Sequence, residues 1–295
     1  MPRLALVADL GGTKIAVARV DESGLITHRE VGPTPAAGGI AVVDAIANLL
    51  RKLSARGAVG IGVDVPGVAH RDGTVWAPNL AGWKCMPLAS LLAERIGLPV
   101  VVDSDRNAFV TGEAWCGAAR GCDDVVFLMI GTGIGAGIIS GGRLLRGCGE
   151  LSGCAGWLAV RDKFQRPYER IGCLEAHVAG PGIAAAARRA LRRPATAEDV
   201  VKLARVGDER AKQVMESAGL YLGRGLANVV DILNPRMIVI GGGVAAAGEL
   251  LLGPARRTMR QWAQPLAVKQ VRLVRSRLGA RAGILGMARL AFDHV

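Results

Sequence analysis

The chain has 295 residues, of which 51% are apolar and 41 are glycine, and its 37 Lys and Arg against 25 Asp and Glu give a formal net charge of +12. The apolar content excludes a disordered chain, because it is sufficient to bury a core. The glycines have no period of three, which excludes collagen, so the excess indicates turns that need glycine's backbone freedom. The length predicts one large domain or, more readily, two lobes.

Cysteine usage and the chain start indicate the compartment. The six cysteines form no C-x-x-C pair, so neither a thioredoxin motif nor a paired-cysteine zinc site is predicted. Scattered thiols in a chain of this length favour a reducing compartment, and the first residues lack a signal-peptide pattern, so we expect a cytoplasmic protein. The uncharged stretch 125–142 contains six glycines and predicts a strand–turn–strand rather than a membrane span.

The positive charge is carried mainly by arginines spread along the chain, and only seven of the 37 basic residues are lysine. Aromatic residues do not interleave with them, as a binder of single-stranded nucleic acid would require. A nucleic-acid surface or a polyphosphate substrate would also use such charge. The dispersed pattern favours a solvated basic surface, and we predict no nucleic-acid partner.

The predicted elements of the first half begin with two strands joined by a glycine turn at Gly11-Gly12, which indicates a hairpin rather than a strand entering a helix. Strands alternate with helices after this hairpin. In chain order, we predict strands at 4–9 and 14–20, a helix at 41–53, a strand at 59–65, a helix at 87–96, a strand at 99–102 and a helix at 106–115.

The pattern restarts after Asp124, and superposing Gly11 on Gly131 gives an offset of 120 residues between two halves that repeat strand, glycine turn and strand. The second half continues mainly as helix, with a capping signature at Thr196. We predict a strand at 125–130, a glycine turn at 131–137, a strand at 138–145, helices at 182–193, from Thr196 and at 208–233, strands at 237–240 and 271–274, and a helix at 280–292. The alternation predicts an α/β protein with two related lobes and a cleft between them.

Three glycine clusters directly follow apolar strands, at 9–14, 131–137 and 241–243. Glycine lets successive backbone N–H groups point at anionic oxygens, so such turns are candidate phosphate cradles. In the first cluster, Asp9 could hold Mg²⁺ or position water, and Thr13 and Lys14 could contact phosphate. No G-x-x-x-x-G-K-[ST] loop is present, and the second cluster leads into a strand, unlike a Rossmann turn. Each cluster taken alone also fits a tight hairpin.

An ordered series of motifs extends over nearly the whole chain and resembles the ROK family (repressors, open reading frames, sugar kinases) of the actin-like ATPase superfamily. The segments that carry the resemblance are Asp9-Leu-Gly-Gly-Thr-Lys14, Val65-Pro-Gly-Val68, Ala77-Pro-Asn-Leu80 with Trp83, Val102-Asp-Ser-Asp-Arg-Asn107, Gly112-Glu113, Gly131-Thr-Gly-Ile-Gly-Ala-Gly137, Gly172-Cys-Leu-Glu175, Leu233-Asn-Pro235, Ile238-Val-Ile-Gly-Gly-Gly243 and Gly283-Ile-Leu-Gly-Met-Ala288.

The resemblance implies an α/β fold of two actin-like (ribonuclease H-like) lobes around a nucleotide and sugar cleft. It places residues 1–118 in the N-terminal lobe, with 281–295 packing back on it, and 119–280 in the C-terminal lobe. It implies ATP and Mg²⁺ as cofactors. The implied ATP and phosphate residues are Asp9, Gly11, Gly12, Thr13, Lys14, Thr132, Gly133, Gly241, Gly242 and Gly243, the last three near adenosine; the implied sugar residues are Gly67, Asn79, Ser104, Asp105, Cys154, Trp157 and Glu175.

The resemblance also gives Asp105 a role. It matches the family's catalytic aspartate, which accepts the proton of the sugar hydroxyl, here the 6-hydroxyl of a hexose or amino sugar, during attack on the γ-phosphoryl group. This makes the chain a carbohydrate kinase, a phosphotransferase with an alcohol as acceptor. Taken without the family, Asp105 also fits the N-cap of the helix that follows it.

Two departures from the family pattern concern the sugar and metal sites. Ser104 stands where the family has asparagine, and Cys154 and Trp157 stand where it has a sugar-binding Glu and a zinc-binding His. In the zinc loop, only Cys173 and Glu175 remain of the metal and sugar ligands. Because a tetrahedral zinc site needs four ligands, we predict no structural zinc. Trp157 would either stack on a sugar ring or fill the space left by zinc, and we favour filling.

Competing functions follow from these departures. The first hypothesis is an ATP-dependent sugar kinase, and the second is a sugar-binding regulator or low-activity pseudokinase of the same fold, without a DNA-binding module. Polyphosphate as phosphoryl donor is a further variant. We expect a small-molecule sugar partner, no membrane partner and, as the family default, a homodimer. The sequence does not identify the sugar.

Overall fold

The computed structural model describes residues 2–294, which divide into two compact units that are treated separately here. The first unit contains the described residues up to Gly121, residues 144–152 and the residues from Arg277; the second contains 122–143 and 153–276. Segment 144–152, which the sequence analysis places in the C-terminal lobe, thus belongs to the first unit. Met1 and Val295, the ends of the predicted lobes, lie outside the described residues.

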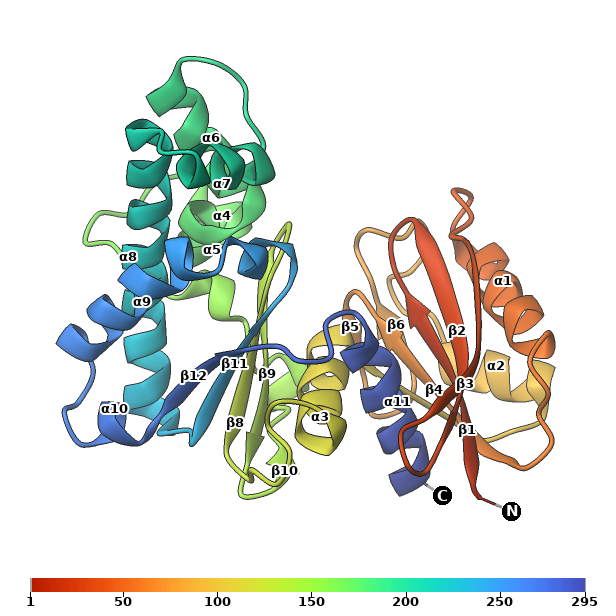
Figure 1. Cartoon of the computed structure of the whole chain (residues 1–295). Coiled ribbons are helices and arrows are strands. Elements are labelled where there is room, and N and C mark those ends of the chain that lie inside the picture. The colour runs from red at the N-terminus through yellow and green to blue at the C-terminus, as the bar shows by residue number, and fades with distance from the viewer. Residues whose placement is uncertain (1, 295) are drawn as a thin grey trace. The chain divides into compact units, whose positions relative to one another are not determined.

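A five-stranded sheet forms the centre of the first unit, in the order β3-β2-β1-β4-β7 (Figure 1). Its first two strands form the predicted antiparallel hairpin, and β1, β4 and β7 run parallel. The strands are β1 (Leu4–Leu10), β2 (Lys14–Asp21), β3 (Ile26–Pro33), β4 (Ala58–Val65) and β7 (Val100–Ser104). The sequence analysis does not predict β3, because an edge strand with largely exposed polar residues lacks the apolar pattern of a buried strand.

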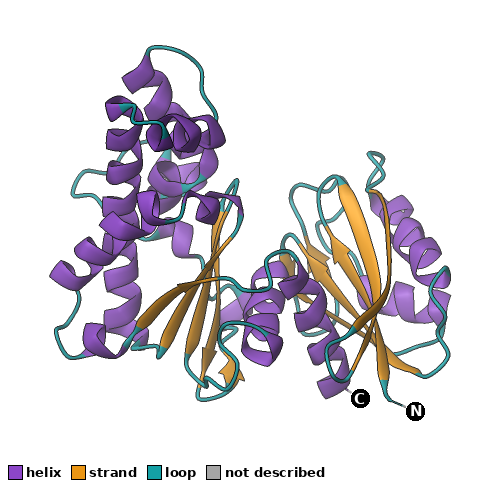
Figure 2. Cartoon of the chain, viewed as in Figure 1, coloured by secondary structure: helices purple, strands orange, loops and turns teal. Residues whose placement is uncertain are grey.

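Helices cover both faces of this sheet (Figure 2), which explains why β1 is apolar at consecutive positions. Leu6 and Ala8 face the core shared with α1 (Gly39–Arg51) and α2 (Leu88–Ile96). Ala5 and Val7 face the core shared with α3 (Asp105–Cys116) and α11 (Arg281–His294). The latter approach is close, because a Cβ atom on Gly62 of β4 would collide with the carbonyl of Met287. A small ribbon of β5 (Val68–Ala69) and β6 (Val75–Trp76) follows β4.

The sheet of the second unit repeats the same strand order, β10-β9-β8-β11-β12, which confirms the predicted repetition of one plan. Its strands are β8 (Val125–Ile130), β9 (Ile134–Ser140), β10 (Arg143–Leu144), β11 (Met237–Gly241) and β12 (Arg272–Arg275). The predicted glycine turn at 131–137 is too long. Antiparallel pairing continues up to Ile130 opposite Ile134, so only residues 131–133 form the turn, and Gly135 and Gly137 pair within β9.

The long helix α8 (Glu209–Leu233) organises the helical part of the second unit. Asp208 caps its start by accepting a hydrogen bond from the Ala211 N–H group at 2.9 Å, and Asn234, in a left-handed conformation before Pro235, ends it. It packs against α5 (Cys173–Val178), α6 (Gly180–Leu191), α7 (Ala197–Arg205) and α9 (Glu249–Trp262). The sequence analysis assigns no element to 249–262, whose interior proline weakens the helical signal. Short helices α4 (Tyr168–Ile171) and α10 (Ala267–Gln270) complete the unit.

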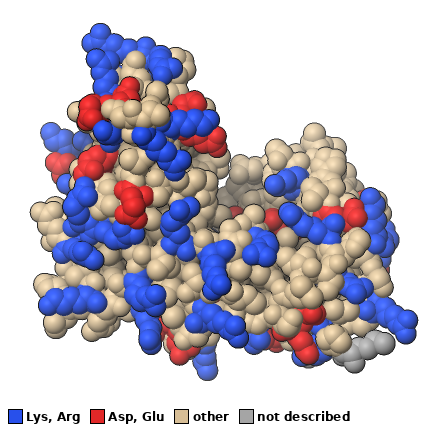
Figure 3. Space-filling view, in the orientation of Figure 1, with Lys and Arg blue, Asp and Glu red and all other residues tan. Residues whose placement is uncertain are grey.

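Surface charge and helix length bear on two classes of partner. Figure 3 shows Lys and Arg dispersed over the visible face of each unit rather than gathered in one patch, in line with the predicted solvated basic surface. Within residues 2–294, no helix combines the length and the hydropathy needed to cross a bilayer.

Candidate functional site

Three aspartates stand in one row across the first sheet. Asp9 on β1 pairs with Asp64 on β4, which in turn pairs with Asp103 on β7, so the three side chains share one face near the carboxyl ends of the strands. This face is the one covered by α3 and α11: a Cβ atom added to Gly283 of α11 would lie 2.7 Å from Asp64 Oδ2. The sequence analysis assigns a site role only to Asp9 among the three.

Asp105 begins α3, directly after this row. The N-cap residue is Ser104, so the alternative interpretation of Asp105 as the N-cap is wrong. Asp105 Oδ1 accepts a hydrogen bond from the Arg106 backbone N–H group at 2.7 Å. Burial raises the pKa of Asp105 to about 6, against the opposing effect of the Arg106 N–H group and guanidinium, and the Asp9 charge raises it further. A carboxylate with this pKa is a competent base near neutral pH.

Asp103 holds the turn that carries Asp105. Its Oδ1 atom accepts hydrogen bonds from the Ser104 N–H group at 2.7 Å and the Asn107 side-chain amide at 2.8 Å. Its Oδ2 atom lies 2.7 Å from the guanidinium of Arg146, which also lies 3.5 Å from Glu150. Because Asp103 is buried, this pairing compensates a charge that would otherwise be costly, and it binds segment 144–152 to the first unit.

Asp64 is the residue that the sequence analysis misses most clearly. It is 1% exposed, and neither carboxyl oxygen has a hydrogen bond of good geometry to any residue in 2–294. Burial raises its pKa well above the usual range, and the charges of Asp9 and Asp105 add to this effect, which the nearby Leu10 N–H group offsets only in part. A single aspartate inside the apolar strand 58–65 is the signal that could have found it, because unpaired buried acids concentrate at functional sites.

The first glycine turn presents its exposed residues beside Asp9. The Gly11 N–H group donates to the Lys14 carbonyl at 2.9 Å, and the Thr34 hydroxyl donates to the Gly11 carbonyl at 2.7 Å. Gly12 has open space around it, and Thr13 and Lys14 are exposed. Burial raises the pKa of Asp9, while Lys14, Arg29 and the contact with Asp64 lower it. The turn thus combines free donors with a carboxylate.

The remaining sugar residues predicted in this unit occupy different environments. Gly67 packs so closely against the Trp76 carbonyl that a Cβ atom would collide with it, and Asn79 is exposed in the loop after β6. Ser104 is 3% exposed, with a hydroxyl that has no hydrogen-bond partner within 2–294. Their sugar contacts remain predictions.

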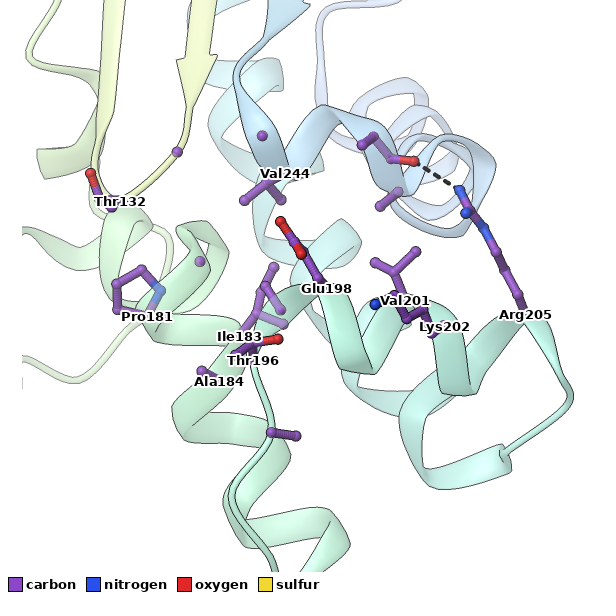
Figure 4. Close-up of a pocket in the computed structure, with 17 residues that line it drawn as sticks. Thr132, Pro181, Ile183, Ala184, Thr196, Glu198, Val201, Lys202, Arg205 and Val244 are labelled. Carbon is purple, nitrogen blue, oxygen red and sulfur yellow. Dashed lines mark hydrogen bonds between the residues drawn. The ribbon is translucent and has the colours of Figure 1, made fainter. Parts of the chain in front are cut away.

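A pocket of about 860 Å³ lies within the second unit, next to the second glycine turn (Figure 4). Of the predicted nucleotide residues, Thr132 and Gly243 line it. Gly133 faces Glu175 instead, and Gly241 is buried against Phe127. Gly242 shapes the turn: its φ of 87° and the Ile130 carbonyl beside it leave no room for a side chain. The other lining residues, which the sequence analysis did not name, include Gly180, Pro181, Ile183, Glu198, Val201, Lys202, Arg205 and Val244.

The N-termini of two helices and one side-chain hydrogen bond shape this pocket. The Gly180 N–H group at the start of α6 donates to the Gly131 carbonyl at 2.8 Å, which brings a helix N-terminus to the turn. Helix α7 begins with a capping box, in which Thr196 and Asp199 each bond the other's backbone. At the other end of α7, Arg205 donates to the Ala246 carbonyl at 2.9 Å. The arrangement gives an apolar slot with a positive helix end at one side.

Comparison with known proteins assigns the family. The model of the ROK family matches residues 6–294. The chain belongs to the ROK family. It is 33% identical to a glucokinase of Thermotoga maritima, covering 100% of this chain and 99% of the relative, and 31% identical to an N-acetyl-D-glucosamine kinase of Citrobacter koseri, covering 95% and 96%. A ROK family glucokinase from Streptomyces griseus, solved with glucose and AMPPNP, is 32% identical with a TM-score of 0.81, covering 98% and 99%.

The residues of the second unit that the sequence analysis predicts to bind sugar lie around Glu175. Its Oε2 atom accepts a hydrogen bond from the Ile134 N–H group at 2.7 Å, and burial raises its pKa against that bond. Cys154 precedes the short 3-10 helix Ala155–Trp157, Trp157 is its last residue, and both are exposed. The expectation that Trp157 fills the zinc space is wrong, because its side chain is 54% exposed.

Tyr168 is buried in segment 166–175, where the resemblance leads one to expect the family's zinc loop. It is 5% exposed, and its hydroxyl lies 2.8 Å from His177 Nε2. The His177 ring stacks on Tyr221 with 4.2 Å between centroids. Burial lowers the pKa of His177 to about 4, with Arg161 and Arg189 adding to the effect, so the ring is neutral and shares a hydrogen bond with the tyrosine hydroxyl. Among residues 2–294, no three or more His, Cys, Asp or Glu side chains are grouped to hold a metal; the absence of zinc stays a prediction.

Replacing Tyr168 with Phe tests whether this hydrogen bond stabilises the loop. We expect the free energy of unfolding to fall by about 1 kcal/mol, because the variant loses one partly buried hydrogen bond. The matched control is Tyr221→Phe, whose ring also contacts His177. Thermal unfolding with and without EDTA measures both variants and the original protein. A Tm that falls on chelation, together with one zinc per chain by metal analysis, would contradict the prediction that the protein has no structural zinc.

Proposed function

We propose that this ROK protein transfers the γ-phosphoryl group of ATP to the 6-hydroxyl group of a hexose or amino sugar, with Asp105 as general base. The observation that carries the proposal is the partly buried Asp105 carboxylate, whose pKa of about 6 suits it to accept a hydroxyl proton at neutral pH. It stands next to a glycine turn with free donors, which phosphoryl transfer requires.

The class of acceptor follows from the relatives. The chain aligns over nearly its whole length with kinases named for glucose and N-acetyl-D-glucosamine, and it is a carbohydrate kinase. The sugar itself is less constrained. Cys154 and Trp157 are exposed and lack the charge of the Glu and His that the resemblance leads one to expect. Losing one charged hydrogen-bond partner costs roughly 1.5–3 kcal/mol. We therefore expect a sugar preference that differs from that of a standard glucokinase.

The pocket in the second unit supports ATP rather than polyphosphate as donor. Its walls are mostly apolar, with Pro181, Ile183, Val201 and Val244 among them, and suit a nucleoside base. A polyphosphate chain would need cations along its length. The S. griseus glucokinase was solved with an ATP analogue, AMPPNP, which agrees with this choice.

Asp105 is the group that accepts the proton of the sugar hydroxyl. Its Oδ1 atom is engaged by the Arg106 N–H group, so Oδ2 is the atom that accepts the sugar proton while the sugar oxygen attacks phosphorus. Asp103 and Arg146 fix the turn that precedes it, which keeps this oxygen oriented. Thr13, Lys14 and Thr132 would bind the phosphates of the donor.

The residues around Asp9 fit Mg²⁺. Magnesium prefers oxygen ligands and is bound by one or two carboxylates together with substrate phosphates. Asp9 offers such a carboxylate; burial raises its pKa, and a bound cation would offset that effect as Lys14 and Arg29 already do in part. Asp9 is therefore the residue that would hold the ion. When bound, Mg²⁺ neutralises charge on the transferring phosphoryl group.

A coupled assay of ADP release over a panel of hexoses, hexosamines and N-acyl sugars tests the proposed function. We expect ATP-dependent turnover with at least one sugar, because the Asp105 and glycine-turn groups are all present. Separate reactions replace ATP with polyphosphate. Sugar binding without turnover for every member of the panel would favour the regulator or pseudokinase alternative.

The Asp105→Asn variant tests the base. We expect kcat to fall by about 10²–10⁴-fold, because the amide cannot accept the hydroxyl proton. The KM values for sugar and ATP should change far less. The control is Asp44→Asn, which neutralises an exposed carboxylate on α1 of the same unit. Full activity in Asp105→Asn would disprove the assignment.

The pH dependence of kcat/KM provides an independent test of Asp105. The base works in its ionised form, which is present above its pKa and lost as pH falls through about 6. We expect kcat/KM to decline about tenfold per pH unit below that value. Steady-state rates between pH 5 and 8, with the folded fraction monitored by circular dichroism, measure the profile. A flat profile across this range would contradict the role.

A further inference from the structure

One acidic side chain of the pocket plays no part in the function described so far. Helix α7 turns Glu198, Val201, Lys202 and Arg205 toward the pocket, at the spacing of one helix face. Arg205 is engaged by the Ala246 carbonyl. Glu198 makes no hydrogen bond or ion pair with any residue in 2–294. Because Glu198 lies on a largely apolar side of the pocket, its carboxylate suits a ligand that donates hydrogen bonds.

The contacts order the pocket along its length. The Gly131–Gly133 turn, the start of α6 and Val244 meet at one end, since a Cβ atom on Gly180 would lie 3.3 Å from the Gly131 carbonyl and 4.0 Å from Val244. The bond between Arg205 and the Ala246 carbonyl marks the other end. Figure 4 shows Glu198 between these ends, with its carboxylate directed toward Val244. Glu198 thus faces whatever lies next to the phosphates.

In a nucleoside triphosphate, the group next to the phosphates is the ribose. Its 2′- and 3′-hydroxyl groups are adjacent donors, and an ionised carboxylate has two acceptor oxygens and no donor. Acidic side chains read ribose hydroxyls in this way in dinucleotide-binding folds. We propose that Glu198 binds the ribose hydroxyls of the phosphoryl donor and makes the protein selective for ribonucleotides. The base then lies beyond it, in the slot between Val201 and the 3-10 helix Gly243–Ala247.

This inference rests on the proposed use of ATP, but its test needs no turnover. Isothermal titration calorimetry measures the Kd of AMPPNP, ATP, 2′-deoxy-ATP and 3′-deoxy-ATP without sugar, for the original protein and for Glu198→Gln and Glu198→Ala. We expect the original protein to bind ATP about 10-fold more tightly than either deoxy analogue, the usual effect of one charged hydrogen bond. In both variants the ratio of the Kd values for the deoxy analogues and ATP should fall to about one, because the charged hydrogen bond is lost.

The controls separate the possible causes. Glu209→Gln neutralises an exposed glutamate at the start of α8, in the same unit, and should keep the ratio of the original protein. A change in KM for ATP with an unchanged KM for sugar would further support a donor-side role. Ribose discrimination that survives in Glu198→Ala would overturn the inference, as would equal binding of ATP and 2′-deoxy-ATP by the original protein. Nucleotide selectivity without turnover on any sugar would support the inference while contradicting the kinase function.

Discussion

The first unit depends on how it accommodates three aspartates side by side on one face of its sheet. Asp9, Asp64 and Asp103 occupy neighbouring strands at the same level, and burial together with the charges of Asp9 and Asp105 raises the pKa of Asp64. Arg146 compensates the last of them, and Lys14 and Arg29 act on the first. Asp64, in the middle, forms no ion pair with any residue in 2–294. Burial raises the pKa of Asp105, which directly follows this row, and the Asp9 charge adds to that effect.

In the second unit, glycines and small apolar side chains form the pocket. Its glycines let backbone approach backbone, as where Gly242 passes the Ile130 carbonyl, and the space that remains is lined by small and branched apolar side chains. Polar groups are few, so each one has a large effect on what the pocket accepts. In the loop around Tyr168, the side chains of Tyr168, His177 and Tyr221 form a cluster in the segment for which the family resemblance implies a zinc site.

Local patterns predicted the fold well. Apolar runs ended by glycine identified β1, β8 and β11, and the capping signature at Thr196 and the apolar periodicity over 208–233 predicted helices that the structure confirms. The same reasoning could not find β3, whose pairing with β2 is a tertiary effect, or the role of Arg146, which lies more than 40 residues from Asp103 along the chain. It named Asp105 and Thr132 from motifs. It missed Asp64 and Glu198, because burial and pocket geometry, rather than spacing, distinguish them.

Helix α11 has a consequence for how the chain acquires its structure. One face of the first sheet is covered by residues such as Ile284 and Met287, at the opposite end of the chain from Ala5 and Val7, which they contact. A nascent chain therefore carries β1 and β2 with this apolar face only partly covered until α11 has been synthesised, whereas every residue of the second unit precedes α11. The first unit begins first and closes last.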